Sequence, residues 1–285
     1  STIDINIQQI IRTAIENYNT RMADGPNEGE PAKNVGVIVM DPDTGEILGM
    51  DSSDWYDLND PRDLSSFYTR EEIDAMSEEE MLEHLNDIWR NYCISDTYEP
   101  GSTYKPITVA SALECGAISE DDTYYCGGYY TVSGQIIRCA HLAGHGMLTV
   151  PESLSYSCNA CLMQIGEKLG ASDFLRYQKM FQFGSKTGID LPGEASGILF
   201  TEDTMKDLEL ATSTFGQGFT CTMIQEAAAF CSLINGGYYY QPHVVSTVTD
   251  SAGTVVETME PTLQCQTVSR ETSDFIREAL GGSME

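Results

Sequence analysis

Apolar residues at the start of the chain recur with the spacing of one helix face. The positions are Ile3, Ile7, Ile10, Ile11, Ala14, Ile15 and Tyr18. This spacing predicts an amphipathic helix over residues 4–22. The following residues, 23–33, are rich in Gly, Pro and charged side chains and are predicted to form a loop.

Two later segments have the pattern of antiparallel hairpins. Apolar runs at 35–40 and 46–50 flank the turn sequence Asp-Pro-Asp-Thr-Gly. Residues 238–266 alternate and are rich in β-branched side chains, with Asp-Ser-Ala-Gly as the turn. A helix followed by a central antiparallel hairpin favours an α/β or α+β sandwich.

Most of the remaining chain has helical spacing. Residues 70–91 combine a helical pattern with runs of Glu that indicate a solvated face. Residues 101–235 are predicted to be a mostly helical lobe, interrupted at 126–147 and at 183–194. A final helix is predicted to start near Ser269.

Composition narrows the possible functions. The chain has 285 residues, 41% of them hydrophobic, which is enough for a core. Its 15 basic and 44 acidic residues give a net charge of −29, which argues against binding nucleic acid or an anionic membrane surface. No segment approaches the ~20 apolar residues that span a bilayer, and no signal peptide is present. Since the first residue is Ser rather than Met, we expect a piece of a longer protein.

The nine cysteines are too few for a disulfide scaffold in a chain of this size. Cys126 and Cys139 flank a predicted hairpin, and a disulfide between them is one possibility. Together with His141 and His145 they also form a loosely zinc-like set. Because four such residues can fall close together by chance and the set has no C-x2-C pair, we expect no metal site.

The best chemical candidate is Ser102-Thr-Tyr-Lys105, framed by Gly101 and Pro106. A helix that begins at Ser102 places Lys105 one turn later on the same side. A lysine that loses its proton in a desolvated site can act as general base for a serine nucleophile. By itself, S-x-x-K is common in proteins.

A second motif, Ser157-Cys158-Asn159, gives this candidate more weight. Ser157 can relay a proton between Lys105 and a leaving amine, and Asn159 can offer its amide to a substrate. The alternative is that Ser157 or Asn159 caps a helix. Cys158 and Cys161 have redox spacing, but no thioredoxin-like βαβ context surrounds them.

S-x-x-K followed by S-x-N resembles the signature of penicillin-binding proteins and serine β-lactamases. The likeness is greatest to the transpeptidase domains of class B penicillin-binding proteins of division or sporulation type. Met223 stands where the family usually has Pro. The segments that carry the likeness follow the family's order and are residues 1–10, 36–50, 89–108, 144–170, 183–194 and 214–225.

The resemblance implies a penicillin-binding/β-lactamase-like fold and a serine D,D-transpeptidase that cross-links peptidoglycan stem peptides without a cofactor. It implies that Ser102 attacks the carbonyl of the penultimate D-Ala, that Lys105 takes the hydroxyl proton and that Ser157 passes it to the departing D-Ala. Asn159 would orient the donor strand. Further substrate-binding candidates are Thr103, Gly216, Gln217 and Gly218.

The family's third motif is K-T-G or K-S-G on a strand that lines the cleft. Lys186-Thr187-Gly188 has the right letters, but Gly and Pro residues close a turn around it and no alternating strand surrounds it. We therefore predict a structural role for Lys186. The last lysine is Lys206, so we expect this single domain to be truncated before its true third motif and its last sheet strands.

The resemblance also implies a location and partners. We expect the domain to work at the extracytoplasmic face of the bacterial cell membrane, anchored by a segment outside this chain. β-Lactams should acylate the same serine, and a membrane glycan polymerase is a possible partner. Two alternatives stay open: a β-lactam sensor or non-catalytic penicillin-binding module, which a cross-linking rate would separate, and a serine β-lactamase, which would need a deacylation base.

Overall fold

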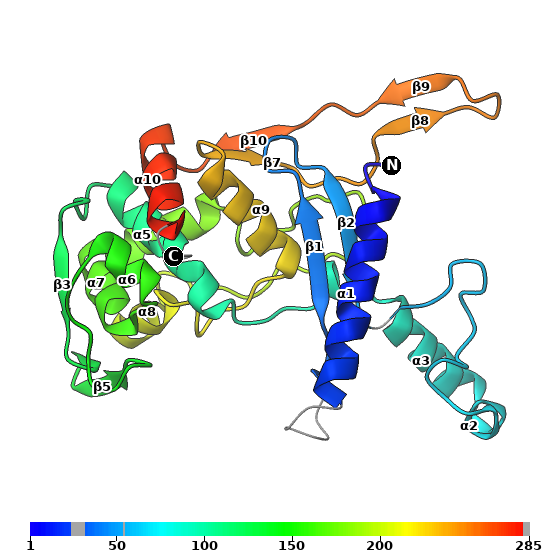
Figure 1. The fold of residues 1–285 in the computed structure, drawn as a ribbon, viewed down its shortest axis with the longest axis horizontal. Coiled ribbons are helices and arrows are strands. Elements are labelled where there is room, and N and C mark those ends of the chain that lie inside the picture. The colour runs from blue at the N-terminus through cyan, green and yellow to red at the C-terminus, as the bar shows by residue number, and fades with distance from the viewer. Residues whose placement is uncertain (24–31, 54, 282–285) are drawn as a thin grey trace.

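The computed structural model describes residues 1–23, 32–53 and 55–281, and Figure 1 shows their arrangement. The helices are α1 (Ile5–Ala23), α2 (Arg70–Ala75), α3 (Glu78–Trp89), α4 (Tyr92–Ser95), α5 (Lys105–Glu114), α6 (Val150–Ser155), α7 (Asn159–Met180), α8 (Asp207–Ser213), α9 (Met223–Ile234) and α10 (Arg270–Gly281). The strands are β1 (Gly36–Met40), β2 (Ile47–Ser52), β3 (Thr123–Cys126), β4 (Tyr129–Val132), β5 (Gln135–Arg138), β6 (Gly146–Thr149), β7 (Tyr238–Tyr240), β8 (Thr247–Thr249), β9 (Val255–Thr258) and β10 (Leu263–Gln266). In the part of the chain that is described, none of these helices has the length and apolarity to cross a membrane.

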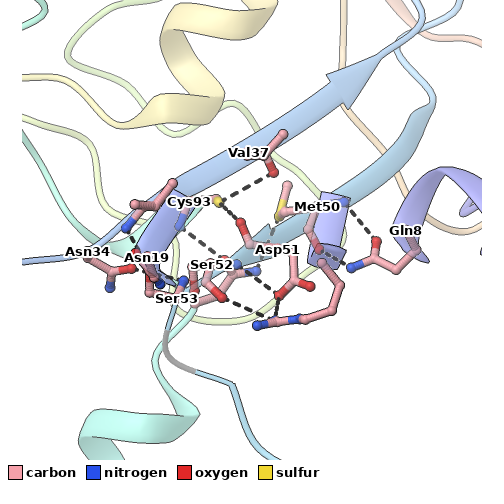
Figure 2. A network of polar contacts seen from close by, with 12 residues as sticks. Gln8, Asn19, Asn34, Val37, Met50, Asp51, Ser52, Ser53 and Cys93 are labelled. Atoms are coloured by element: carbon pink, nitrogen blue, oxygen red, sulfur yellow. Dashed lines mark hydrogen bonds and ion pairs between the residues drawn. The ribbon is translucent and has the colours of Figure 1, made fainter. Parts of the chain in front are cut away.

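The first helix and the first hairpin form as predicted. β1 and β2 pair antiparallel across the Asp-Pro-Asp-Thr-Gly turn, and α1 lies along β2 with Ile11 and Ile15 buried. Figure 2 shows the polar contacts that fasten the helix to the strand. The Gln8 amide donates to Met50 O at 2.9 Å and accepts from Met50 N at 3.0 Å, and Arg12 forms an ion pair with Asp51. These contacts fix which face of α1 meets the hairpin.

The predicted hairpin over 238–266 is confirmed, and it consists of two separate pairs of strands. β7 pairs with β10 next to the body of the molecule, and β8 pairs with β9 across the Asp-Ser-Ala-Gly turn. The β8–β9 end extends away from the rest of the chain (Figure 1). Within the described residues, the bridge between Glu46 and His243 is the only β-type pairing between this segment and the β1–β2 hairpin, so the two hairpins do not form one continuous sheet.

The acidic segment 70–91 forms two helices where the periodicity predicted a single pattern. The break falls at Met76 and Ser77 because Ser77 starts a new helix with a capping box. Its hydroxyl accepts from Glu80 N, and the Glu80 carboxylate accepts from Ser77 N at 2.8 Å. The Glu side chains are exposed, as expected for a solvated face.

The largest hydrophobic core lies in the predominantly helical region formed by α5–α9. α5 and α7 pack together at its centre, and Ile107, Ala110, Leu162 and Ile165 are fully buried there. β3–β6 form two short hairpin ladders beside α7 (Figure 1). α10, the predicted last helix, packs on α5, α6 and α9 and so closes this core from the C-terminal side.

Candidate functional site

Ser102 lies at the entrance to α5, with its side chain exposed. The predicted helix start is shifted: Gly101–Tyr104 form a 3-10 turn, and the α-helix proper begins at Lys105. Gly101 enters the turn with φ of +65°, a conformation that favours glycine. Tyr104 is buried against Phe174, Phe183 and Phe219. These ring contacts hold the turn against the core, while the Ser102 side chain is exposed.

Lys105 is the buried cation of this site, with only 2% of its surface exposed. Its ammonium donates to Ser157 Oγ at 2.7 Å and to Ser157 O at 2.6 Å. Burial lowers the pKa of Lys105 to about 8. A lysine with this pKa is partly neutral near physiological pH and is able to accept a proton.

Ser157 and Asn159 stand at the turn between α6 and α7. Ser157 has φ of +48°, which is rare for a residue with a side chain and marks a backbone that its surroundings hold in place. The N-cap of α7 is Cys158, and no side chain caps the helix. The capping explanation for Ser157 or Asn159 is therefore wrong. Within the described residues the side-chain amide of Asn159 has no hydrogen-bond partner.

The glycine-rich loop after α8 lies directly on the backbone beside Ser102. Gly101 N donates to Gly216 O at 2.9 Å. A Cβ added at Gly216 would lie 2.1 Å from Gly101 O, so only glycine fits this approach. Gly218 N donates to Glu99 Oε1 at 2.7 Å, and Gln217 between them is exposed. The structure thus packs this loop against the turn that carries Ser102, and the substrate-binding role of its residues stays a prediction.

Thr103 is placed less favourably for binding a substrate. Its side chain is exposed, but its hydroxyl donates to Pro100 O at 2.7 Å and so closes the local turn. The Thr103 hydroxyl therefore has a local partner, and within the described chain no hydrogen bond joins it to Lys105 or Ser157. Ser102 Oγ and Lys105 Nζ, both within the described residues, are also not hydrogen-bonded to each other. Such contacts often tighten only when substrate binds.

Lys186-Thr187-Gly188 lies in a loop outside any strand. The Thr187 hydroxyl donates to Glu194 Oε1 at 2.6 Å, Gly188 N donates to Glu194 Oε2 at 3.1 Å, and Glu194 is buried. Lys186 itself is exposed. The motif's hydroxyl is thus engaged in holding the loop together, in agreement with a structural role.

Sequence reasoning missed two contacts that hold the segment before Ser102 in place. Tyr98 pairs with Cys221 through two backbone hydrogen bonds, and its hydroxyl donates to Glu226, which ties the segment before Ser102 to α9. No sequence motif indicated these contacts.

All nine cysteines are free thiols, so the disulfide considered between Cys126 and Cys139 does not form.

Comparison with known sequences matches the chain to the family whose motifs it resembles. A sequence model described as the penicillin binding protein transpeptidase domain matches residues 35–284. The chain is 36% identical over 283 residues to stage V sporulation protein D from Bacillus subtilis strain 168, covering 98% of this chain and 39% of that protein. It is 29% identical over 276 residues to the peptidoglycan D,D-transpeptidase MrdA from Escherichia coli K12, covering 91% of this chain and 40% of that protein. The chain thus spans about two fifths of the length of these curated relatives.

Solved structures share the fold. The D,D-transpeptidase domain of a peptidoglycan glycosyltransferase from Eggerthella lenta aligns with a TM-score of 0.79 at 25% identity, over 99% of this chain and 65% of that one. A peptidoglycan synthetase from Bifidobacterium adolescentis aligns with a TM-score of 0.80 at 23% identity, over 99% of this chain and 46% of that one. These likenesses confirm the predicted penicillin-binding fold of helices and antiparallel strands.

Proposed function

Because the chain belongs to the penicillin-binding protein transpeptidase family, we propose that it carries a serine D,D-transpeptidase site that cross-links peptidoglycan stem peptides. One observation carries the proposal. A buried lysine of lowered pKa, one turn after an exposed serine, is held by Ser157 of the second motif. This arrangement supplies a nucleophile, a base and a proton relay in one place.

The reaction follows from these positions. Ser102 Oγ attacks the carbonyl of the penultimate D-Ala, and its proton passes to neutral Lys105. The hydrogen bond from Lys105 to Ser157 offers a route for that proton to the nitrogen of the departing D-Ala. The C–N bond then breaks and an acyl-Ser102 ester forms. An amine of a second stem peptide attacks this ester, forms the new amide and releases Ser102 with its proton.

The surroundings of the serine support the remaining steps. Ser102 sits in the first turn of the helical segment, where backbone N–H groups lack helical acceptors and can stabilise an oxyanion. The free amide of Asn159 is suited to hold the donor peptide. The loop around Gly216 borders the serine and would form one wall for the substrate. No step in this scheme calls for a metal or an organic cofactor.

The wider role is inferred from relatives. We place the domain at the extracytoplasmic face of the bacterial membrane, in division or sporulation; one relative is named as a sporulation protein and another as a peptidoglycan D,D-transpeptidase. β-Lactams would acylate Ser102 as substrate mimics. The domain from Eggerthella lenta is named as part of a peptidoglycan glycosyltransferase, and we propose a glycan polymerase as a partner of this domain.

Product analysis tests the activity directly. The protein as its gene encodes it is incubated with a donor ending in D-Ala-D-Ala and an amine acceptor, and products are followed by mass spectrometry. We expect a cross-linked dimer together with free D-Ala, and neither with Ser102→Ala. Slow acylation by penicillin without any dimer would indicate a sensor, and rapid hydrolysis of the drug would indicate a β-lactamase. Either result would overturn the proposal.

A further inference from the structure

Four potential metal ligands lie close together, and one of them, Cys158, directly follows Ser157 in the chain. They are Cys126 at the end of β3, Cys139 just after β5, His145 just before β6 and Cys158 at the start of α7. Their ligand atoms all lie within 4.8 Å of one another. Four segments of the chain therefore contribute one ligand each to a single small volume.

The spacing of these atoms fits a tetrahedral metal ion. With Zn–S bonds of about 2.3 Å, two sulfurs of a tetrahedron lie about 3.8 Å apart, and a sulfur and a nitrogen slightly less. The Cys139 and Cys158 sulfurs are 3.8 Å apart, and Cys139 Sγ is 3.8 Å from His145 Nδ1. A disulfide needs about 2.05 Å, so these thiols are arranged around a point and are not bonded to each other.

The backbone is built to bring the four ligands together. A Cβ on Gly128 would lie 2.1 Å from Leu142 O, and one on Gly144 would lie 2.5 Å from Cys126 O. Only glycine allows the loop that carries Cys139 and His145 to pack so closely on the end of β3.

We propose that Cys126, Cys139, His145 and Cys158 form a structural zinc site. Three cysteines and one histidine in a tetrahedron are a common zinc ligand set, and soft thiolates select zinc over Mg²⁺ or Ca²⁺. The three cysteines are at most 2% exposed, so the site is closed and leaves no position for a substrate. The ligands are also too close together to enclose an iron–sulfur cluster, whose thiolates bind separate irons.

The assignment revises the expectation drawn from the sequence. His141 belonged to the zinc-like set, but it is exposed and only stacks on His145 with ring centroids 4.9 Å apart. Cys158 takes the fourth place instead. Sequence reasoning treated Cys158 only as the middle residue of S-x-N and as half of a redox pair, because its distance along the chain from Cys139 hid their contact.

The site has a consequence for the proposed catalytic centre, and this part of the inference rests on the proposed function. Cys158 lies between Ser157 and Asn159, and Ser157 holds Lys105 through both its hydroxyl and its carbonyl. A metal on Cys158 would link this strained turn to the β3–β6 hairpins. Zinc is therefore expected to position Ser157 and Asn159, without taking part in the reaction.

Metal content and a matched pair of histidine variants test the site. By mass spectrometry of the metal in purified protein, we expect about one zinc per chain. Cobalt exchanged for the zinc should give the strong visible absorption of tetrahedral Co²⁺ bound to thiolates. His145→Ala should lower zinc affinity by at least about tenfold in chelator competition. His141→Ala, in the same loop and in contact with the same ring, should leave the affinity unchanged.

These measurements of metal content and affinity do not depend on catalytic activity. Wild-type protein that contains no zinc and takes up no Co²⁺ would overturn the proposal, as would a disulfide within the cluster or equal affinities in the two histidine variants. If the His145→Ala variant fails to fold, the metal measurements on the wild-type protein still decide. In a separate assay, removing zinc should slow acylation by penicillin, and adding it back should restore the rate. An unchanged rate would remove the positioning role and leave the site itself standing.

Discussion

At the scale of single residues, the two lysines of the candidate motifs have opposite environments. Lys105 is buried and bonded to Ser157, while Lys186 is exposed in a loop that Glu194 holds together. Lys105→Ala should therefore slow acylation by a fluorescent penicillin by about 10²-fold or more, as expected for loss of a general base. Lys186→Ala should acylate at nearly the wild-type rate. Loss of labelling in Lys186→Ala alone would move the third motif to residues 186–188.

The lowered pKa of Lys105 gives the acylation rate a predictable pH dependence. Burial disfavours the charged ammonium and brings the pKa to about 8. Below that pH the lysine is protonated and cannot accept the serine proton. The rate should therefore fall about tenfold for each pH unit below about 8 and level off above it. A rate that stays constant between pH 6 and 9 would exclude Lys105 as the base.

At the scale of elements, the contact between the glycine-rich loop and the turn at Gly101 offers a controlled test. Gly216 and Gly134 have φ of +81° and +82°, so an alanine is strained by its backbone in both places, at about 1–3 kcal/mol. Only at Gly216 would the new Cβ also meet a backbone atom, Gly101 O at 2.1 Å, whereas nothing lies within 4 Å at Gly134.

We therefore expect Gly216→Ala to lower the melting temperature more than Gly134→Ala and to slow acylation, because the clash displaces the turn that carries Ser102. Gly134→Ala should acylate normally. Thermal denaturation and the acylation rate of both variants measure this difference. Equal rates in the two variants would show that the loop does not support the serine.

The elements with a regular pattern were predictable from the sequence, and those fixed by tertiary contacts were not. The spacing of Ile7, Ile11 and Ile15 was enough to predict α1, and turn residues were enough to place both hairpins. The break between α2 and α3 depends on the capping box at Ser77, a local signal within an otherwise continuous helical pattern. How the 238–266 hairpin joins the first one is a long-range contact that no local pattern contains.

In the candidate site, too, the local motifs were predictable from the sequence and the long-range contacts were not. The motifs predicted Ser102, Lys105, Ser157 and Asn159 as site residues because each motif is a short local pattern, and the structure brings Lys105 and Ser157 into contact. The convergence of Cys158 with Cys126 and Cys139 depends on how α7 packs against the β3–β6 hairpins, which the sequence does not specify. The role of Gly101 as a partner of Gly216 is likewise a contact between segments more than a hundred residues apart.

At the scale of the whole molecule, the proposed function depends on Ser102 being the residue that carries the acyl group. The protein as its gene encodes it is treated with benzylpenicillin, and the adduct is located by mass spectrometry of the intact protein and of its peptides. We predict that the mass of one penicillin is added, that it maps to Ser102, and that Ser102→Ala abolishes it. Labelling that persists in Ser102→Ala, or that maps to Ser157, would contradict the account.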